Sequence, residues 1–160
     1  MTGMTLSAGA LSQIEKELEK YPADRGQSAV MAALRIAQEE FRWISKDVMQ
    51  EIADLLAIPP IHVYEVATFY SMYEHKDVGV HKICVCTNIS CQLCGSKKVL
   101  DQLKEKTGIG PGETTADGRI SIKEVECLGA CGGAPMMQVN KDYHENLTPD
   151  SIDSILEGLD

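Results

Sequence analysis

Apolar side chains recur at helical spacing along residues 11–73. Leu11, Ile14, Leu18 and Tyr21 are three or four positions apart, so they share one face of a first predicted helix. We expect this helix to end at Tyr21-Pro22, because a proline disfavours helical geometry in the residue before it.

The same spacing predicts three further helices. Ser28 and Ser45 are the expected N-caps of the second and third, and Pro59-Pro60 opens the fourth. The residues expected to face inward are Val30, Leu34, Ala37 and Phe41 in the second helix, Val48, Ile52 and Leu55 in the third, and Val63, Val66, Tyr70 and Tyr73 in the fourth. These stripes predict a helical bundle with an apolar core.

The pattern changes after Gly79. Val80–Cys86 is rich in β-formers and has apolar side chains at odd and even positions, which predicts a central strand covered on both faces. Residues 119–126 are also β-rich, but Ile122 and Val125 break the two-residue alternation. We therefore expect a bulge or a shortened strand there.

Residues 95–107, between these two strands, predict a helix that ends at Gly108 in a C-cap position; its inward residues are Val99, Leu100 and Leu103. A helix that crosses between two neighbouring strands makes them parallel, with a right-handed connection. The first part of this region is therefore a β-α-β unit.

A hairpin and a last helix complete the pattern. Residues 135–139 and 143–147, joined by 140–142, read as two antiparallel strands. Thr148-Pro149 supplies an N-cap and an N1 proline for a helix over Ile152, Ile155 and Leu156. The resulting order, β-α-β followed by β-β-α, is the minimal thioredoxin-like order. Pro135 stands where such folds often keep a cis proline.

Composition and charge narrow the class of protein. The 160 residues are 44% hydrophobic and 24% charged, and the net charge is −9. No basic cluster stands out, which argues against nucleic acid or an anionic membrane surface as a partner. The N-terminus lacks the order of a signal peptide, and prolines and charges interrupt the most apolar stretch, residues 52–70. We expect no membrane insertion and a reducing compartment, where six cysteines indicate metal or redox chemistry.

Four of the cysteines fall at the ends of the two predicted parallel strands. Cys86 ends the first strand and Cys91 lies in the following loop; Cys127 ends the second strand and Cys131 lies in its loop. Parallel strands end at the same edge of a sheet, so the two loops should converge. Two thiolates from each loop match the needs of a 2Fe–2S cluster, which takes two thiolates on each iron.

Three other interpretations use the same residues. Zinc favours Cys-x2-Cys knuckles, and only Cys91-x2-Cys94 has that spacing. The same pair at a helix start could be the dithiol of an oxidoreductase, although Cys127 and Cys131 would then have no role. A plant-type ferredoxin would use Cys86-x4-Cys91-x2-Cys94 and a distant cysteine. Of the remaining thiols, we expect Cys84 to be a small buried apolar residue, and Cys94 to pack near the cluster without binding it.

The stretches "VATFYSMY", "VCTNISC", "DGRISIKEVECLGACGGAPMMQVN" and "ENLTPDSIDSILEGL" closely resemble the thioredoxin-like 2Fe–2S ferredoxin subunit of respiratory complex I, NADH–quinone oxidoreductase. The resemblance spans roughly residues 11–158. It implies an α/β fold in which an N-terminal helical bundle (residues 1–78) precedes a thioredoxin-like β-α-β-β-β-α ferredoxin domain (residues 79–160). It also implies one 2Fe–2S cluster, with four ligands at Cys86, Cys91, Cys127 and Cys131.

The resemblance further implies a partner subunit that binds FMN and NADH, contact with it through the N-terminal helices, and membership of a larger complex peripheral to the cytoplasmic side of the inner membrane. The cluster would accept single electrons from the flavin. Similar subunits serve NAD-linked hydrogenases and formate dehydrogenases. The chain has no nucleotide fingerprint of its own, because GIGPG follows a helix, so we expect no complete active site on this chain.

The fourth predicted helix bears on the partner. "VYEVATFYSMY" spreads apolar side chains around most of a helix circumference, and aromatic residues and methionine are enriched at protein interfaces. The alternative is a central helix buried on all sides. We expect this region to dock the flavin-binding subunit.

Overall fold

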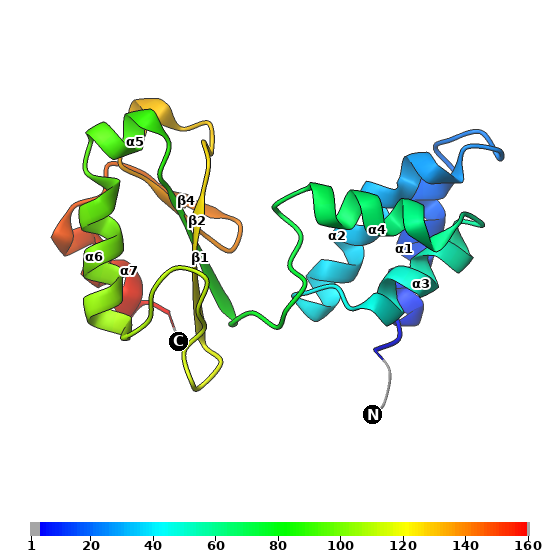
Figure 1. Cartoon of the computed structure of the whole chain (residues 1–160), viewed down its shortest axis with the longest axis horizontal. Coiled ribbons are helices and arrows are strands. Elements are labelled where there is room, and N and C mark those ends of the chain that lie inside the picture. The colour runs from blue at the N-terminus through cyan, green and yellow to red at the C-terminus, as the bar shows by residue number, and fades with distance from the viewer. Residues whose placement is uncertain (1–3, 160) are drawn as a thin grey trace. The chain divides into compact units, whose positions relative to one another are not determined.

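Helices form the first part of the chain. The computed structural model describes residues 4–159, which divide into a helical unit that ends at Asp77 and a sheet unit that begins at Val78 (Figure 1). Within residues 4–77, the elements are α1 (Ala8–Leu18), the 3-10 turn η1 (Gly26–Ala29), α2 (Val30–Phe41), α3 (Lys46–Leu55) and α4 (Pro60–Phe69). One apolar cluster joins them, and Ile14, Leu34, Val48 and Ile52 are almost fully buried in it.

One of the two predicted serine caps is present. The Ser45 hydroxyl accepts a hydrogen bond from the backbone N–H of Val48 and caps α3, as predicted. The prediction for Ser28 is wrong, because η1 runs directly into α2 and places Ala29 at the N-cap position, with no side-chain cap.

Helix α4 is shorter than its apolar spacing predicts. It ends at Phe69, and Tyr70 has an extended backbone, so Tyr70 and Tyr73 do not lie on the helix. Tyr73 is nevertheless buried, because its hydroxyl donates to the carbonyl oxygen of Met31 in α2 at 3.0 Å. This tertiary contact takes the chain out of helical geometry. None of the helices within residues 4–159 is both long and apolar enough to cross a membrane.

A four-stranded sheet organises residues 78–159. Its strands are β1 (His81–Cys86), β2 (Ile120–Val125), β3 (Met137–Val139) and β4 (Asp142–His144), in the order β2-β1-β3-β4. The helices of this unit are α5 (Ile89–Leu93), α6 (Ser96–Thr107) and α7 (Pro149–Glu157), together with the 3-10 turn η2 (Cys131–Gly133). Strand β1 is central and parallel to β2, and β3 is antiparallel to β1, which confirms the predicted α/β fold.

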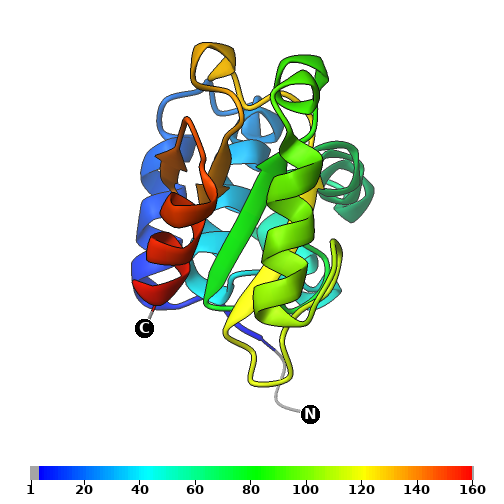
Figure 2. The same cartoon turned by 90° about the vertical axis from the view of Figure 1, so that its left-hand side faces the viewer.

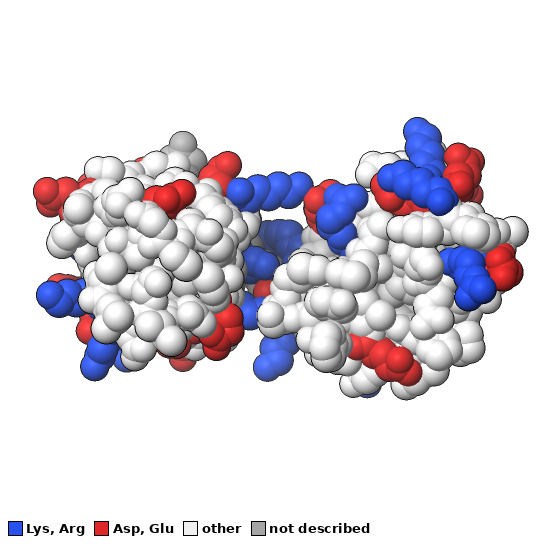
Figure 3. Space-filling model, turned by 90° about the horizontal axis from the view of Figure 1, so that it is seen from above, with Lys and Arg blue, Asp and Glu red and all other residues white. Residues whose placement is uncertain are grey.

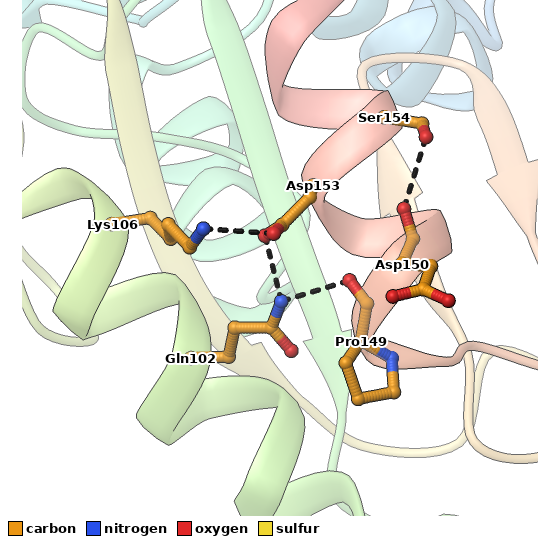
Figure 4. A network of polar contacts seen from close by, with 6 residues as sticks. All are labelled: Gln102, Lys106, Pro149, Asp150, Asp153 and Ser154. Carbon is orange, nitrogen blue, oxygen red and sulfur yellow. Dashed lines mark hydrogen bonds and ion pairs between the residues drawn. The ribbon is translucent and has the colours of Figure 1, made fainter.

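Helices α6 and α7 cover one face of this sheet (Figure 2). Ile83 and Val85 of β1 pack against Val99 and Leu103 of α6 in the core of the unit. Polar contacts also link the two helices (Figure 4). Gln102 donates to the carbonyl oxygen of Pro149 and to Asp153, and Lys106 forms an ion pair with the same carboxylate at 2.8 Å.

Strand β2 pairs regularly with β1, from His81 opposite Ile120 to Cys86 opposite Val125. The strand contains no bulge. It ends at Val125 and is therefore shorter than the predicted range of residues 119–126, which is the second of the two expected outcomes. Its other edge is covered by the preceding loop, because Gly112 donates to the carbonyl of Ile122. The covering loop protects the edge of the sheet and accounts for the irregular apolar pattern.

The C-terminal elements follow the sequence closely. Strands β3 and β4 form the predicted hairpin, but both are shorter than predicted, and Asp142 already belongs to β4 rather than to the turn. Thr148 and Ser151 form a capping box at the start of α7. The Ala134–Pro135 peptide bond is cis.

The two serines provide a matched test of helix capping. Ser45→Ala should lower the free energy of unfolding by about 1 kcal/mol, because one N–H at the start of α3 loses its acceptor. Ser28→Ala should change it by less than about 0.5 kcal/mol, as expected of an exposed residue outside a cap. Urea denaturation followed by circular dichroism measures both, and equal losses would contradict the assignment of caps.

Candidate metal centre

The first cysteine pair is buried at the end of β1. Cys86 is the last residue of the strand, and Cys91 lies in α5, which Asn88 caps by accepting the N–H of Ile89. The two thiols are hydrogen-bonded to each other and pack against Met136. The strand and the short helix together fix both sulfurs in a dry environment.

The second pair is exposed and follows β2. The Sγ atoms of Cys127 and Cys131 are 3.4 Å apart, and the N–H of Gly129 donates to Cys127 Sγ at 3.4 Å. Gly129 has a φ of 83°, a conformation that favours glycine and lets the loop turn back between the two cysteines.

Direct contacts join the two loops. Asn88 Nδ2 donates to Glu126 Oε2 at 2.8 Å, and the backbone N–H of Leu128 donates to the sulfur of Cys86. Because β1 and β2 are parallel, α5 and η2 lie at the same end of the sheet in both views (Figures 1 and 2). The convergence expected from the sequence is therefore present in the structure.

Burial and neighbouring groups shift the pKa values of Cys86, Cys91 and Cys131. Burial raises the pKa of Cys91 to about 11, and the neighbouring Cys86 and a charge on Cys131 add to the rise. Burial also raises the pKa of Cys86, but backbone N–H groups of Leu128 and Asn88 outweigh it and leave the pKa below the usual thiol value. The hydrogen-bonded Cys127 raises the pKa of Cys131. Binding of a metal by all four thiols would release protons.

The remaining thiols differ from these four. Cys84 is buried in β1, as expected of a small apolar residue, whereas Cys94 is exposed at the end of α5. An oxidoreductase dithiol needs an attacking cysteine with a lowered pKa. Cys91 has a raised pKa and is buried, which argues against Cys91 and Cys94 as such a dithiol.

The four thiols fall into two close pairs, one on each loop. Among the described residues, no three His, Cys, Asp or Glu side chains are grouped so as to hold one metal ion. The thiols instead occur as two close pairs on neighbouring loops, which matches two thiolates on each of two irons.

The end of the sheet unit that carries these loops faces the viewer at the left of Figure 3. Its middle is free of charged side chains, and both acidic and basic side chains lie at its margin. Ile89 and Leu93 of α5 are exposed there. The middle of this end is thus uncharged, and Ile89 and Leu93 give it an apolar part.

A family model described as thioredoxin-like [2Fe-2S] ferredoxin matches residues 14–160. The chain belongs to this family. The fold, the two thiol pairs and their spacing agree with the family's 2Fe–2S cofactor.

Relatives of this ferredoxin match it over nearly its whole length. It is 44% identical to an NADH-quinone oxidoreductase subunit of Rhizobium meliloti, over 92% of this chain and 86% of that protein. It is 39% identical to the corresponding NADH-quinone oxidoreductase subunit of Rickettsia bellii, over 99% of this chain and 96% of that protein.

A solved structure shares the fold. The crystal structure of an NAD+-reducing [NiFe]-hydrogenase in the air-oxidized state matches with a TM-score of 0.72 and 22% identity, over 81% of this chain. The ferredoxin spans 22% of that hydrogenase chain.

Sequence reasoning missed two contributors to the site. Helix α5 was not predicted, although Asn88, three residues before Cys91, is a typical N-cap signal. Tyr143, whose hydroxyl donates to the carbonyl oxygen of Leu128 at 2.7 Å, gave no local signal because the contact spans 15 residues.

Two adjacent glycines test how tightly the second loop is held. A Cβ on Gly133 would lie 2.6 Å from the Cβ of Glu145, whereas a Cβ on Gly132 would meet nothing within 4 Å. Gly133→Ala should therefore lower the free energy of unfolding by about 1–3 kcal/mol through overpacking. Gly132→Ala is the control and should leave it nearly unchanged. Chemical denaturation of both variants measures the two free energies of unfolding. Similar free energies would show that the loop can move to accommodate a side chain at Gly133.

Proposed function

We propose that this ferredoxin is an electron-transfer subunit that holds one 2Fe–2S cluster on four thiolates, those of Cys86, Cys91, Cys127 and Cys131. The observation that carries this proposal is the meeting of two close thiol pairs at one edge of the sheet. When bound, such a cluster takes up and releases one electron at a time.

The two cysteine pairs would have different roles at the cluster. Cys86 and Cys91 are buried with Met136, so they exclude water from one side of the site. Cys127 and Cys131 are exposed, so a partner can approach from their side. The backbone N–H of Leu128 lowers the pKa of Cys86, and the N–H of Gly129 donates to Cys127 Sγ.

We further infer that the protein works in an NADH–quinone oxidoreductase. Relatives of nearly the same length are named as subunits of that complex. The cluster of the ferredoxin would exchange single electrons with the FMN of a partner subunit that also binds NADH. The whole complex would be peripheral to the cytoplasmic side of the membrane. The corresponding subunit of an NAD-linked hydrogenase or formate dehydrogenase is the alternative parent complex.

The helical unit, which we treat as a separate domain of residues 1–78, offers a surface for that partner. Helix α4 buries only Val63 and Ala67 and exposes other apolar side chains, so it is not a central helix buried on all sides. The exposed apolar residues in and just after α4 are Ile61, Tyr64, Phe69, Tyr70 and Met72. Aromatic residues and methionine are enriched at interfaces, which supports docking through this surface.

The cofactor can be tested directly. Anaerobically purified protein should contain two irons and two acid-labile sulfides per chain, since the proposed site binds one 2Fe–2S cluster. Alanine in place of any one of the four proposed ligands should abolish the visible absorption, because one iron loses a thiolate. Cys84→Ala and Cys94→Ala are the controls and should retain it. Stoichiometric zinc without sulfide would defeat the proposal, and bleaching by Cys94→Ala but not Cys131→Ala would favour the plant-type ligand set.

Two exposed apolar residues distinguish possible docking surfaces. Phe69 at the end of α4 is 80% exposed, and Leu93 in α5 is 83% exposed, so neither substitution by alanine should alter stability. Phe69→Ala should weaken binding to the flavin-binding subunit by about 1–2 kcal/mol, as for a central interface residue. Binding is measured by titration of the two purified subunits. A loss with Leu93→Ala alone would place the interface on the sheet unit.

The partner should also supply all NADH chemistry. The isolated ferredoxin should bind NADH negligibly, because it carries no nucleotide-binding fingerprint. Its absorption should therefore be bleached by NADH only when the flavin-binding subunit is added. Bleaching of the isolated ferredoxin by NADH would contradict this division of labour.

A further inference from the structure

The segment that follows β3 braces the second cysteine loop. Tyr143 in β4 donates its hydroxyl hydrogen bond to the carbonyl oxygen of Leu128 at 2.7 Å. Farther along the segment, the N–H of Asn146 donates to the carbonyl of Gly133 at 2.6 Å. The loop between Cys127 and Cys131 is thus held by a different part of the chain, and Tyr143 is the side chain that reaches its tip.

Tyr143 and Cys127 hold opposite ends of one peptide group. The carbonyl oxygen of Leu128 and the N–H of Gly129 belong to the same planar peptide, and in a trans peptide they point in opposite directions. The oxygen accepts from Tyr143, and the N–H donates to Cys127 Sγ at 3.4 Å. When the tyrosine hydroxyl fixes the carbonyl, it therefore also aims the N–H at the sulfur.

This peptide needs such a restraint. Gly129 has a φ of 83° and no atom within 4 Å of where a Cβ would stand, so no side-chain contact at Gly129 restrains the peptide before it. Glycine populates both signs of φ, and rotation of this peptide would turn its carbonyl toward Cys127 in place of the N–H. A carbonyl oxygen beside a thiolate would be repulsive.

We propose that Tyr143 is a positioning residue that locks the Leu128–Gly129 peptide and so raises the reduction potential of the iron–sulfur site. This inference rests on the proposed ligand role of Cys127. A hydrogen bond to a ligand sulfur favours the more negative, reduced state, and the potential rises with it. The tyrosine also polarises the peptide, which strengthens its N–H as a donor.

The test uses the full chain with Tyr143→Phe, which removes only the hydroxyl group of a side chain that is 48% exposed. The matched control is Tyr21→Phe, an exposed tyrosine of the helical unit. Redox titration of the iron-loaded proteins, followed by visible absorption, gives the midpoint potentials. Amide hydrogen exchange of Gly129 in the cluster-free proteins, followed by NMR, reports the hydrogen bond separately.

Tyr143→Phe should make the potential more negative and leave the iron content unchanged. At a fixed ambient potential, the ratio of reduced to oxidised protein should fall by about threefold, as expected when a charge-assisted hydrogen bond weakens by up to about a third. A threefold change in this ratio corresponds to a shift of about 28 mV in the midpoint potential, because a tenfold change corresponds to 59 mV for a one-electron couple. Exchange at Gly129 should become faster, and Tyr21→Phe should change neither quantity.

An unchanged potential in an iron-loaded Tyr143→Phe variant would overturn the inference. Should that variant fail to retain iron, faster exchange at Gly129 would support positioning by Tyr143, and unchanged exchange would overturn it. Absence of iron and sulfide from the wild-type protein would instead defeat the proposed ligand set, so the two failures are distinguishable.

Discussion

The parallel pairing of β1 with β2 is the interaction on which the rest of the sheet unit depends. Six consecutive residues pair in one register, with Cys86 opposite Val125 at the end. A slip by one residue would turn every side chain of one strand to the other face of the sheet. Cys86 would then no longer face the loop that carries Cys127 and Cys131. The apolar contacts of Ile83 and Val85 with α6 hold the register, so core packing and the geometry of the thiol site have the same cause.

Backbone N–H groups donate hydrogen bonds to the sulfur atoms of two of the four cysteines. Consecutive N–H groups of Leu128 and Gly129 donate to one cysteine of each pair, and no cationic side chain lies in the middle of that face (Figure 3). Successive N–H groups form concave sites for negative charge, and they do so without a mobile counter-ion. The chain as a whole has a net charge of −9, so this local arrangement, and not the overall field, would offset the charge of thiolates that bind a metal. The hairpin that contributes Tyr143 keeps the loop in this shape.

The helical unit presents a different constraint. It has its own apolar core, yet α4 leaves a row of apolar and aromatic side chains exposed. A helix that is apolar on all sides is buried on all sides, whereas a helix with one buried stripe leaves its other side chains in solvent. Sequence periodicity gives the same pattern in both cases. The structure distinguishes the two cases. In α4, Val63 and Ala67 are buried on one side, and Tyr64 and Phe69 are exposed to solvent.

The sequence by itself determined the order of the elements, all of the long helices and strands, and the cysteine pairs, but not the short helix α5. Helical spacing, the caps at Ser45 and Thr148 and the glycine at 108 depend on neighbouring residues, so they could be predicted and are present. The α/β order and the parallel connection followed from chain geometry, which also brought the two cysteine loops together.

Tertiary structure decided the rest. Helix α4 ends at Phe69 because Tyr73 bonds to Met31, β2 is regular because a loop pairs with its free edge, and the tip of the second cysteine loop is held by Tyr143. Each of these features depends on a contact between residues that are distant along the chain. Local patterns encode backbone preference and the buried face of an element, but they carry no information about which distant group will meet it.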